Sequence, residues 1–515
     1  MQPSVARIVA NDPDTIAVFP GGRGRMGLNP QQQDVTACLK EEMAQGGLGN
    51  TAVWELPAQT ERSMRKVACT VAASLLLSAA AFGEEGPDAK HAGWAQWRGP
   101  LATGVGPDAD PPVEWAENKN IRWKVPIPGQ GHSSPILWKD RIFLTTAIET
   151  EKKVDEEKVK AVEAETPAFH RTSARMPRKV LQFVVMALRR SDGGVLWKRT
   201  VCEEPPHAAT HAHGSWASGS PVTDGQRVYA YFGSYGLYAL DMEGNRKWEK
   251  RFGLLKMKAN FGEGTSPALY ADTLILSQDQ EGPSFIVALD SKTGRERWKV
   301  ARDEGTSWST PLVFEHAGRH QVITSATKRI RSYDAASGAL LWEAAGMTGN
   351  VIPCPVADKG IVYCMSGFRG SALMAIRLAA AKGDITAKPQ ALAWSRQKDT
   401  PYASSPLLYD GLLYYIKINM GVLTCVEAAT GKVHYGSRPL GGINMIYSSP
   451  GGAAGRVYVT GRNGVTLVIK HGPALEVLAR NKLDDGFTAS AALADRELYL
   501  RGHKSLYCIA GDASD

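Results

Sequence analysis

The chain has 515 residues, of which 43% are hydrophobic and 22% charged, and its formal net charge is +8 at pH 7. This composition is ordinary for a soluble protein, and the length suggests either several domains or a repeat architecture. The basic residues lack the interleaved aromatic side chains of a nucleic-acid platform, so we expect no nucleic-acid partner.

Residues 64–83 contain the three parts of a secretory signal peptide. Arg65 and Lys66 form a basic start, residues 67–77 are apolar, and residues 79–83 supply the small side chains that a signal peptidase requires. The apolar stretch is shorter than the roughly 20 residues of a membrane span, and the alternative is a buried core helix. We therefore expect a periplasmic or secreted protein with no transmembrane segment in the mature chain.

Residues 1–63 precede this signal and are rich in Gly, Gln, Asn and Pro, without helical or strand periodicity. A signal peptide belongs at the N-terminus of a precursor. We therefore expect Met64 to be the true start and residues 1–63 to be a non-native, disordered extension.

One pattern recurs along the rest of the chain: a small residue and proline, three short apolar runs, a turn that ends in glycine, and a closing aromatic residue. The position of the proline marks successive copies at Pro135, Pro221, Pro267, Pro311, Pro355, Pro406 and Pro450, with Ala491 in the eighth place. In the clearest copy, residues 264–298, Asp290 and Gly294 predict a tight hairpin turn. Four short antiparallel strands per copy are typical of a propeller blade.

The eighth copy ends without its fourth strand, and residues 120–125, NIRWKV, have the pattern of that strand. We therefore predict an all-β fold: an eight-bladed β-propeller of four-stranded antiparallel blades over residues 120–511. The last blade is closed by the N-terminal strand, which leaves only short blade edges exposed. Residues 84–119 form an entry segment.

The closing aromatic residues have a structural interpretation, because an outer-strand indole can wedge between neighbouring blades and bury a large apolar area. Stacking on a ligand, the alternative, would not require the same residue in nearly every blade. The predicted docking residues are Trp123, Trp197, Trp248, Trp298, Trp342, Trp394 and Tyr435.

Residues 149–179 form a charged insertion in the first copy. The run EKKVDEEKVKAVEAE predicts either a short solvated helix or a disordered flap, and we favour the flap. The densest basic cluster of the chain, Arg171, Arg175, Arg178 and Lys179, lies in this insertion. We interpret it as a solvated basic surface rather than a binding patch.

The run ALDSKTGRERW at residues 288–298 resembles the tryptophan-docking repeat of propellers of the pyrroloquinoline-quinone (PQQ) type. The runs WAQWRGP at residues 94–100 and DGQRVYAYFGSYG at residues 224–236 are similar to an exported branch of that family. The resemblance covers residues 94–511 and implies the fold far more specifically than the function. Two classes share the repeat: quinoprotein dehydrogenases, and scaffold propellers such as the outer-membrane assembly lipoprotein, which bind proteins and carry no quinone.

The dehydrogenase class, as the resemblance implies, holds its quinone with Ca²⁺, an aspartate base and a disulfide between adjacent cysteines. No two cysteines are adjacent in this sequence, and no set of Glu, Asn and Asp can be matched to the calcium ligands. We therefore expect no catalytic or cofactor-binding residues and no cofactor, with PQQ and Ca²⁺ as the alternative. Of the five cysteines after the signal, only Cys354 and Cys364 form a plausible local disulfide pair.

Three histidines lie close together in the run PPHAATHAH at residues 205–213, namely His207, His211 and His213. Imidazole is a common metal ligand, but no acidic residue or cysteine stands at a fixed spacing from them. We interpret the run as a loop that enters the second blade, with a metal site as the weaker hypothesis.

These observations favour a non-catalytic secreted scaffold that binds a protein or a cell-envelope polymer through the loops at one end of the propeller. The alternative is a PQQ-dependent oxidoreductase, an alcohol or sugar dehydrogenase with a diverged site. The identity of the partner and the oligomeric state do not follow from the sequence.

Overall fold

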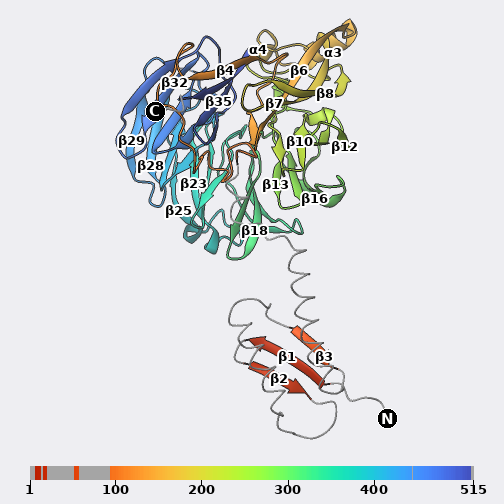
Figure 1. Ribbon diagram of the computed structural model, residues 1–515, viewed down its shortest axis with the longest axis vertical. Helices are drawn as coiled ribbons and strands as arrows, with labels where there is room; N and C mark the ends of the chain where they lie inside the picture. The colour runs from red at the N-terminus through yellow and green to blue at the C-terminus, as the bar shows by residue number, and fades with distance from the viewer. Residues whose placement is uncertain (1–5, 13–14, 20–51, 57–92, 444, 512–515) are drawn as a thin grey trace. The chain divides into compact units, whose positions relative to one another are not determined.

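The computed structural model describes residues 6–12, 15–19, 52–56, 93–443 and 445–511 (Figure 1). The chain forms two units, residues 1–86 and residues 87–515. The predicted signal peptide, residues 64–83, lies outside the described residues. Among the described residues, no helix has the length and apolar character that crossing a membrane requires.

The first unit contains strands β1 (Ala6–Asp12), β2 (Thr15–Phe19) and β3 (Ala52–Leu56), which pair in the order β2-β1-β3. This sheet differs from the expectation that residues 1–63 contain no regular structure. Its strands are short runs with several β-branched residues, which favour extended backbone.

The second unit is an eight-bladed propeller in which each blade is a sheet of antiparallel strands, as predicted. The first four blades are built from β5 (Ile136–Trp138), β6 (Arg141–Lys153), β7 (Lys179–Arg189) and β8 (Val195–Glu204); β9 (Val222–Thr223), β10 (Arg227–Tyr231), β11 (Leu237–Asp241) and β12 (Arg246–Lys250); β13 (Ala268–Tyr270), β14 (Thr273–Gln278), β15 (Ser284–Asp290) and β16 (Glu296–Arg302); and β17 (Leu312–His316), β18 (Arg319–Ser325), β19 (Ile330–Asp334) and β20 (Leu340–Ala344).

Blades 5 to 8 follow the same plan. They are built from β21 (Val356–Asp358), β22 (Ile361–Ser366), β23 (Ala372–Arg377) and β25 (Leu392–Arg396); β26 (Leu407–Tyr409), β27 (Leu412–Ile416), β28 (Val422–Glu427) and β29 (Val433–Pro439); β30 (Gly451–Ala453), β31 (Arg456–Thr460), β32 (Val465–Lys470) and β33 (Val477–Lys482); and β34 (Ala492–Ala494), β35 (Glu497–Arg501), β36 (Ser505–Ala510) and β4 (Ile121–Pro126). The second and third strands are buried almost throughout, because neighbouring blades cover both of their faces.

The N-terminal strand β4 closes the ring by pairing antiparallel with β36 of the last blade, which confirms the predicted closure. Figure 1 shows the orange strand β4 beside the dark blue strand β35 of the same blade. The register places Trp123 opposite Cys508. The last blade therefore contains strands from both ends of the propeller sequence.

The first strands of the blades surround the central axis, where β5 contacts both β9 and β34. At the residue before the proline of each copy, a side-chain acceptor takes a hydrogen bond from the equivalent backbone N–H of the preceding blade. Eight such bonds of 2.9–3.1 Å form a closed circle through Ser134, Ser220, Ser266, Thr310, Cys354, Ser405, Ser449 and Ser490, and back to Ser134. This serine ring, as we call it, ties all eight blades together in register.

Cys354 is the one thiol in the serine ring, and its Sγ accepts from Thr310 N at 3.1 Å. The predicted pairing of Cys354 with Cys364 is wrong, because both thiols are free and buried. Cys364 lies on β22, opposite Met374 of β23, inside its blade. The thiol of Cys354 therefore fills a position that serine or threonine occupies in the other blades.

The entry segment forms hydrogen bonds with the first strands, or the residues just before them, of several blades. Leu137 of blade 1 donates from its backbone to Trp94 O at 2.8 Å, and Gly452 of blade 7 donates to Gly104 O at 2.9 Å. The buried Arg98 guanidinium donates to Pro450 O, Thr103 O and Pro406 O at 2.7–2.9 Å. The segment thus links blades that are distant in the sequence.

Most of the predicted docking residues make one repeated contact with the next blade. The indole Nε1 of Trp248 donates to Ser291 O at 2.9 Å, and its ring lies on Gly294, where a β-carbon would come within 2.7 Å of the indole. The same pairing joins Trp123, Trp197, Trp298 and Trp394 to Gly193, Gly244, Gly338 and Gly431. The glycines have positive φ, so both the conformation and the space exclude a side chain.

The two other docking positions depart from this pattern. Trp342 donates to Gln321 Oε1 within its own blade at 3.0 Å, and it is paired with Gly383 of β24 (Gly383–Asp384), an added strand parallel to β20. Tyr435 is buried, but among the described residues its hydroxyl has no hydrogen-bond partner. For Trp342, the longer turn between β23 and β25 of blade 5 takes the place of the short glycine turn that the other tryptophans contact.

The charged insertion is helical rather than the flap that we favoured. Helix α3 (Glu156–Glu165) is capped by Asp155, whose carboxylate accepts from Glu157 N, and it buries Val159 and Val162; a short helix α4 (Ala168–Arg171) follows. Figure 1 shows both helices beside β6 and β8. Two valines on one helical face provide the apolar contact that a flap would lack.

Candidate functional site

The two ends of the propeller differ in which connections they carry. Because successive strands are antiparallel, the connections between second and third strands and the connections between blades emerge at the same end, which we call the loop face. The turns that hold the docking glycines lie at the opposite end. All of the candidate site residues below, from His132 to His503, belong to connections of the loop face or to the strand ends that border it.

Histidines from distant parts of the sequence meet at the loop face. His132 precedes blade 1 and His503 joins β35 to β36, and their ring centroids lie 5.8 Å apart. The backbone N–H of His132 donates to Ala217 O at 3.0 Å, and His503 Nε2 lies 3.0 Å from Thr488 Oγ1. These contacts place two imidazoles side by side where the last blade meets the first.

A second pair of histidines comes from the connection between blades 1 and 2. The rings of His211 and His213 lie 5.2 Å apart, and His211 stacks on His170 of α4 at 5.5 Å. His213 Nδ1 lies 2.9 Å from the hydroxyl of Tyr447, which precedes blade 7. This contact joins connections from different sides of the ring.

Arg501 is fully buried at the end of β35 and has no carboxylate partner among the described residues. Its Nη1 donates to Ser133 O at 3.1 Å and to Thr145 O at 2.6 Å. Its Nη2 lies against Gly131, where a β-carbon would come within 2.5 Å. Burial lowers the pKa of Arg501 to about 9, because the charged form loses its hydration.

Two further arginines surround the same histidines. Arg175, from the insertion, pairs its backbone with Thr210 and donates from Nε to Ala212 O at 3.2 Å. Burial, and then the positive charge of Arg462 between β31 and β32, lower the pKa of Arg175 and of His213. In the part of the chain that the structure describes, neither arginine forms a salt bridge. We call Arg175, Arg462, Arg501, His132, His211, His213 and His503 the cationic cluster.

The cluster disfavours protonation of its own histidines. Burial and then the charges of His503, Arg501, Arg175 and Arg462 lower the pKa of His132 well below its ordinary value. Burial and then His213, His170 and Arg462 lower the pKa of His211 to about 4. At neutral pH the cluster therefore carries its charge on three arginines, and its imidazoles are neutral.

His207, the third histidine of the predicted group, lies apart from His211 and His213. Its Nδ1 is 2.9 Å from Tyr235 Oη, its Nε2 is 3.1 Å from Leu255 O, and the same Nε2 lies 3.7 Å from Oε1 of the buried Glu263. Among the described residues, no group of three or more His, Cys, Asp and Glu side chains is placed to hold a metal ion.

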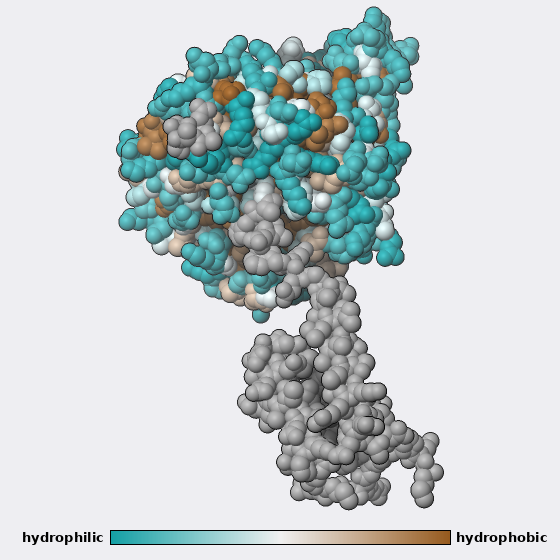
Figure 2. All heavy atoms as spheres, viewed as in Figure 1, coloured by the Kyte–Doolittle hydropathy of each residue, from teal (hydrophilic) through white to brown (hydrophobic). Residues whose placement is uncertain are grey.

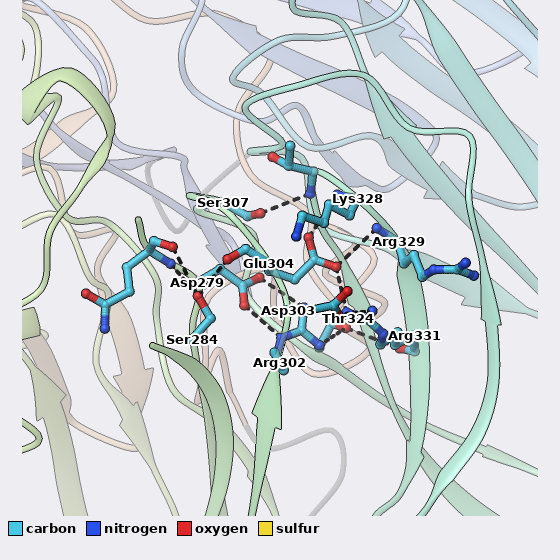
Figure 3. A network of polar contacts seen from close by, with 12 residues as sticks. Asp279, Ser284, Arg302, Asp303, Glu304, Ser307, Thr324, Lys328, Arg329 and Arg331 are labelled. Carbon is cyan, nitrogen blue, oxygen red and sulfur yellow. Dashed lines mark hydrogen bonds and ion pairs between the residues drawn. The ribbon is translucent and has the colours of Figure 1, made fainter. Parts of the chain in front are cut away.

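A second polar network, between blades 3 and 4, is compensated internally (Figure 3). Arg302 donates to both carboxylate oxygens of Asp279 at 2.7 and 3.0 Å, and Arg331 donates to Glu304 at 2.7 Å. Glu304 also accepts from Lys328 N at 2.8 Å. Because each buried charge of this network is paired with an opposite charge, the network links the two blades and its charges are balanced without a ligand.

An apolar group borders the cationic cluster on the loop face. Ile418, Met420 and Met445 are 42%, 53% and 40% exposed, and their segments are joined by the hydrogen bond from Ile446 N to Asn419 O at 2.9 Å. Arg462 N donates to Met445 O at 3.2 Å, which links this group to the cluster. We call Ile418, Met420 and Met445 the apolar rim.

The face of the propeller seen in Figure 2 is mainly hydrophilic, with hydrophobic residues gathered in a few patches. A cavity of about 360 Å³ opens beside the cluster and is lined by Gln130, Ile148, Glu149, Leu181 and Trp216, among others. Gln130 is two residues from His132, and the charge of Glu149 partly opposes the lowering of the pKa of Arg175 by burial and by Arg462. The cavity therefore extends the cluster toward blade 1.

The family model described as outer membrane protein assembly factor BamB matches residues 112–300 and 282–510, which is most of the propeller. The chain belongs to the BamB family. No curated protein sequence matches the chain significantly. The family membership agrees with the resemblance to PQQ-type propeller repeats in the sequence.

Solved structures similar to this BamB-family chain include both classes that the sequence suggested. BamB from Moraxella catarrhalis is 14% identical, covers 64% of this chain and 89% of its own, and has a TM-score of 0.47. Quinohemoprotein alcohol dehydrogenase ADHIIG from Pseudomonas putida HK5 is 10% identical, covers 83% of this chain and 82% of its own, and has a TM-score of 0.50. At these identities, the similarity shows the fold alone.

The residues of this BamB-family propeller do not fit a calcium-bound quinone. Ca²⁺ is bound by six to eight oxygen ligands, several of them carboxylates. Among the described residues, the cationic cluster gathers three arginines, and loop-face carboxylates such as Asp279 and Glu304 are paired with arginines rather than grouped around a cation site.

The cationic cluster is a site that the sequence did not reveal. Arg175 was interpreted as part of a solvated surface, but it is half-buried and faces the histidines, whereas Arg171 and Arg178 are exposed. Arg462 lies in the connection between β31 and β32 and Arg501 ends β35, and neither belongs to a recognisable motif. No local signal marks them, since they meet only when blades 7, 8 and 1 close the ring.

Proposed function

We propose that this protein is a non-catalytic, exported scaffold that binds a partner protein through its loop face, without a quinone. The observation that supports this function is the apolar rim beside the cationic cluster. Exposed apolar side chains grouped on one face mark protein interaction sites. Membership in a family named for outer-membrane protein assembly favours a protein partner in the cell envelope.

Capture experiments with purified full-length protein and an envelope extract of the producing organism test this function. We expect a defined set of partners that the double variant Met420→Glu/Met445→Glu no longer captures, because two carboxylates replace apolar contacts. The matched control is Val477→Glu, on the outer strand β33, where a 44% exposed valine receives the same charge. Equal capture by the wild type, the rim variant and the control would contradict the proposal.

Reconstitution with PQQ and Ca²⁺ tests the alternative, an oxidoreductase. The purified chain is incubated with both and assayed for bound quinone absorbance and for dye reduction with alcohols and aldose sugars. We expect neither, since among the residues that the structure describes no group of carboxylates is placed to hold Ca²⁺. Stoichiometric quinone with alcohol- or sugar-dependent dye reduction would show that the protein is a dehydrogenase.

A further inference from the structure

The charge on the cationic cluster is not balanced within the described part of the chain. Two carboxylates lie nearby, and one of them, Asp485, already accepts from the backbone N–H groups of His503, Lys504 and Ser505 at 3.0–3.2 Å. The other, Glu149, is exposed on β6. Three arginines therefore face at most two carboxylates, one of which is committed to its own turn.

Other buried arginines show that this imbalance is particular to the cationic cluster. Arg302 is paired with Asp279, and Arg331 with Glu304. Arg98 has no carboxylate partner among the described residues, but its two terminal nitrogens donate to three backbone carbonyls. Arg501 donates from Nη1 to two backbone carbonyls, and among the described residues the buried Nε of Arg462 has no hydrogen-bond partner. A buried cation with free donors is costly unless an anion completes it.

The surroundings indicate what kind of anion fits. The apolar rim adjoins the cluster, since Arg462 donates to Met445 O, and Tyr447 reaches His213 with its hydroxyl. A small inorganic anion or a sulfated polymer would gain nothing from an apolar rim. A peptide that carries carboxylates and apolar side chains can contact both surfaces at once.

We propose that the cationic cluster is the binding site for an acidic segment of the partner protein, whose Asp or Glu carboxylates pair with Arg175 and Arg462, while the buried Arg501 adds its positive charge beneath them. This inference rests on the proposed scaffold function and adds the chemistry of the ligand. The neutral histidines supply N–H donors to the same carboxylates. The adjacent rim receives the apolar residues of the segment.

Fluorescence anisotropy with a labelled peptide tests the site directly. The probe is a twelve-residue peptide, in which Glu alternates with Leu, titrated with the full chain at low and at moderate salt. We expect saturable binding that weakens with salt, and the double variant Arg175→Gln/Arg462→Gln to bind about tenfold or more weakly, because two charge-assisted contacts are lost. Both residues are half-buried, so these variants do not open the core.

The matched control is Arg329→Gln on the same face. The Arg329 guanidinium is already paired with Glu343 at 3.3 Å and with Asp384 at 2.9 Å, so its loss should change affinity less than twofold. A peptide with Gln in place of Glu should not bind. Equal binding of the Glu and Gln peptides, or undiminished binding by the double variant, would overturn the proposal.

Competition distinguishes a peptide site from a general anion site. Inorganic pyrophosphate and heparin are each titrated against the bound peptide. Displacement by either at concentrations below the peptide's own dissociation constant would overturn the assignment to a protein segment. Weak competition, reduced by moderate salt, supports it.

The failure of this inference is distinct from failure of the proposed function. If envelope partners still require Met420 and Met445 while the Glu peptide does not bind, the scaffold function stands and the acidic ligand is wrong. If the peptide binds through Arg175 and Arg462 while partner capture ignores the rim, the anion site stands and the scaffold function is wrong.

Discussion

At the scale of single residues, the contact between an indole and a glycine is repeated at five of the blade boundaries. Trp248 rests on Gly294, which needs its positive φ of 70° for the turn and its missing side chain for the indole. Gly318 has a similar φ of 73°, but nothing lies within 4 Å of the place where its β-carbon would be. These two glycines separate the cost of backbone conformation from the cost of lost packing.

We expect Gly318→Ala to lower the free energy of unfolding by about 1 kcal/mol, through backbone strain alone. Gly294→Ala should cost ~1–3 kcal/mol more, because the methyl group displaces the indole of Trp248. Chemical denaturation monitored by tryptophan fluorescence measures both. Equal losses for the two variants would mean that the indole contact contributes nothing beyond the turn.

The histidines of the cationic cluster make stability depend on pH. His132, His211 and His503 have folded-state pKa values below the ordinary value of about 6.5, chiefly because they are buried. The nearby arginines and histidines of the loop face lower these pKa values further, and the charge of Asp485 opposes the lowering at His503. The unfolded chain therefore binds protons first as the pH falls below about 6.5, and the folded state loses stability down to the folded pKa, about 4 for His211.

We therefore expect the thermal midpoint to fall between pH 7.5 and pH 5.5, and to fall less in the double variant His132→Gln/His503→Gln. The acidic peptide should reduce the fall for the wild type, because bound carboxylates raise the pKa of the histidines. Scanning calorimetry with and without the peptide measures the effect. An identical pH dependence in the wild type and the histidine variant would show that these imidazoles do not control it.

At the scale of the elements, blades are joined by more than apolar contact. The network between blades 3 and 4 buries Arg302 and Asp279 completely, and the guanidinium also donates to Thr324 Oγ1 and to the hydroxyl of Tyr333 at 3.0 and 2.7 Å. Such a pair adds little relative to an apolar one, but leaving one member alone is expensive.

We expect Asp279→Asn to lower the free energy of unfolding by ~3–5 kcal/mol, because Arg302 would keep its charge without a partner. The control is Asp192→Asn, whose carboxylate pairs with Arg189 on the surface at 2.7 Å and should contribute less than about 1 kcal/mol. Urea denaturation gives both values. A small loss in both variants would mean that water reaches Arg302.

At the scale of the whole molecule, the serine ring and the strand β4 both act on ring closure. The ring connects each blade to the next through one backbone N–H, and β4 supplies the strand that the last blade lacks. Neither feature belongs to a single blade. A propeller closed in this way loses contacts on both sides of any blade that opens.

We expect Ser449→Ala to cost ~1–3 kcal/mol, because the N–H of Ser405 would be buried without an acceptor. Cys354→Ser should retain the circle and change stability by less than about 1 kcal/mol, since a hydroxyl stands at the equivalent place in seven of the blades. Thermal unfolding of both variants tests this. A large loss in Cys354→Ser would show that the thiol is required for packing rather than as an acceptor.

Local patterns were enough to predict the propeller. The blade count, the glycine turns and the closing strand could be inferred because each depends on residues within one copy, such as Asp290, Gly294 and Trp298, repeated at a regular spacing. The local pattern was insufficient where a neighbour decides the outcome. Helix α3 buries Val159 and Val162 against the rest of the propeller. Cys354 is a member of the serine ring, where its Sγ accepts from Thr310 N and its own N–H donates to Ser405 Oγ of the adjacent blades.

The amino-acid sequence by itself determined the repeating unit, its number and the strand that completes the ring, since hydrophobic period and turn chemistry act over a few residues. Only the tertiary structure decided where the charges gather. Arg501 contacts Ser133 across 368 positions of the chain, and Arg462 and Arg175 join it from two other blades. A site built from single residues of separate copies has no signature in the sequence, because closure of the ring alone brings its members together.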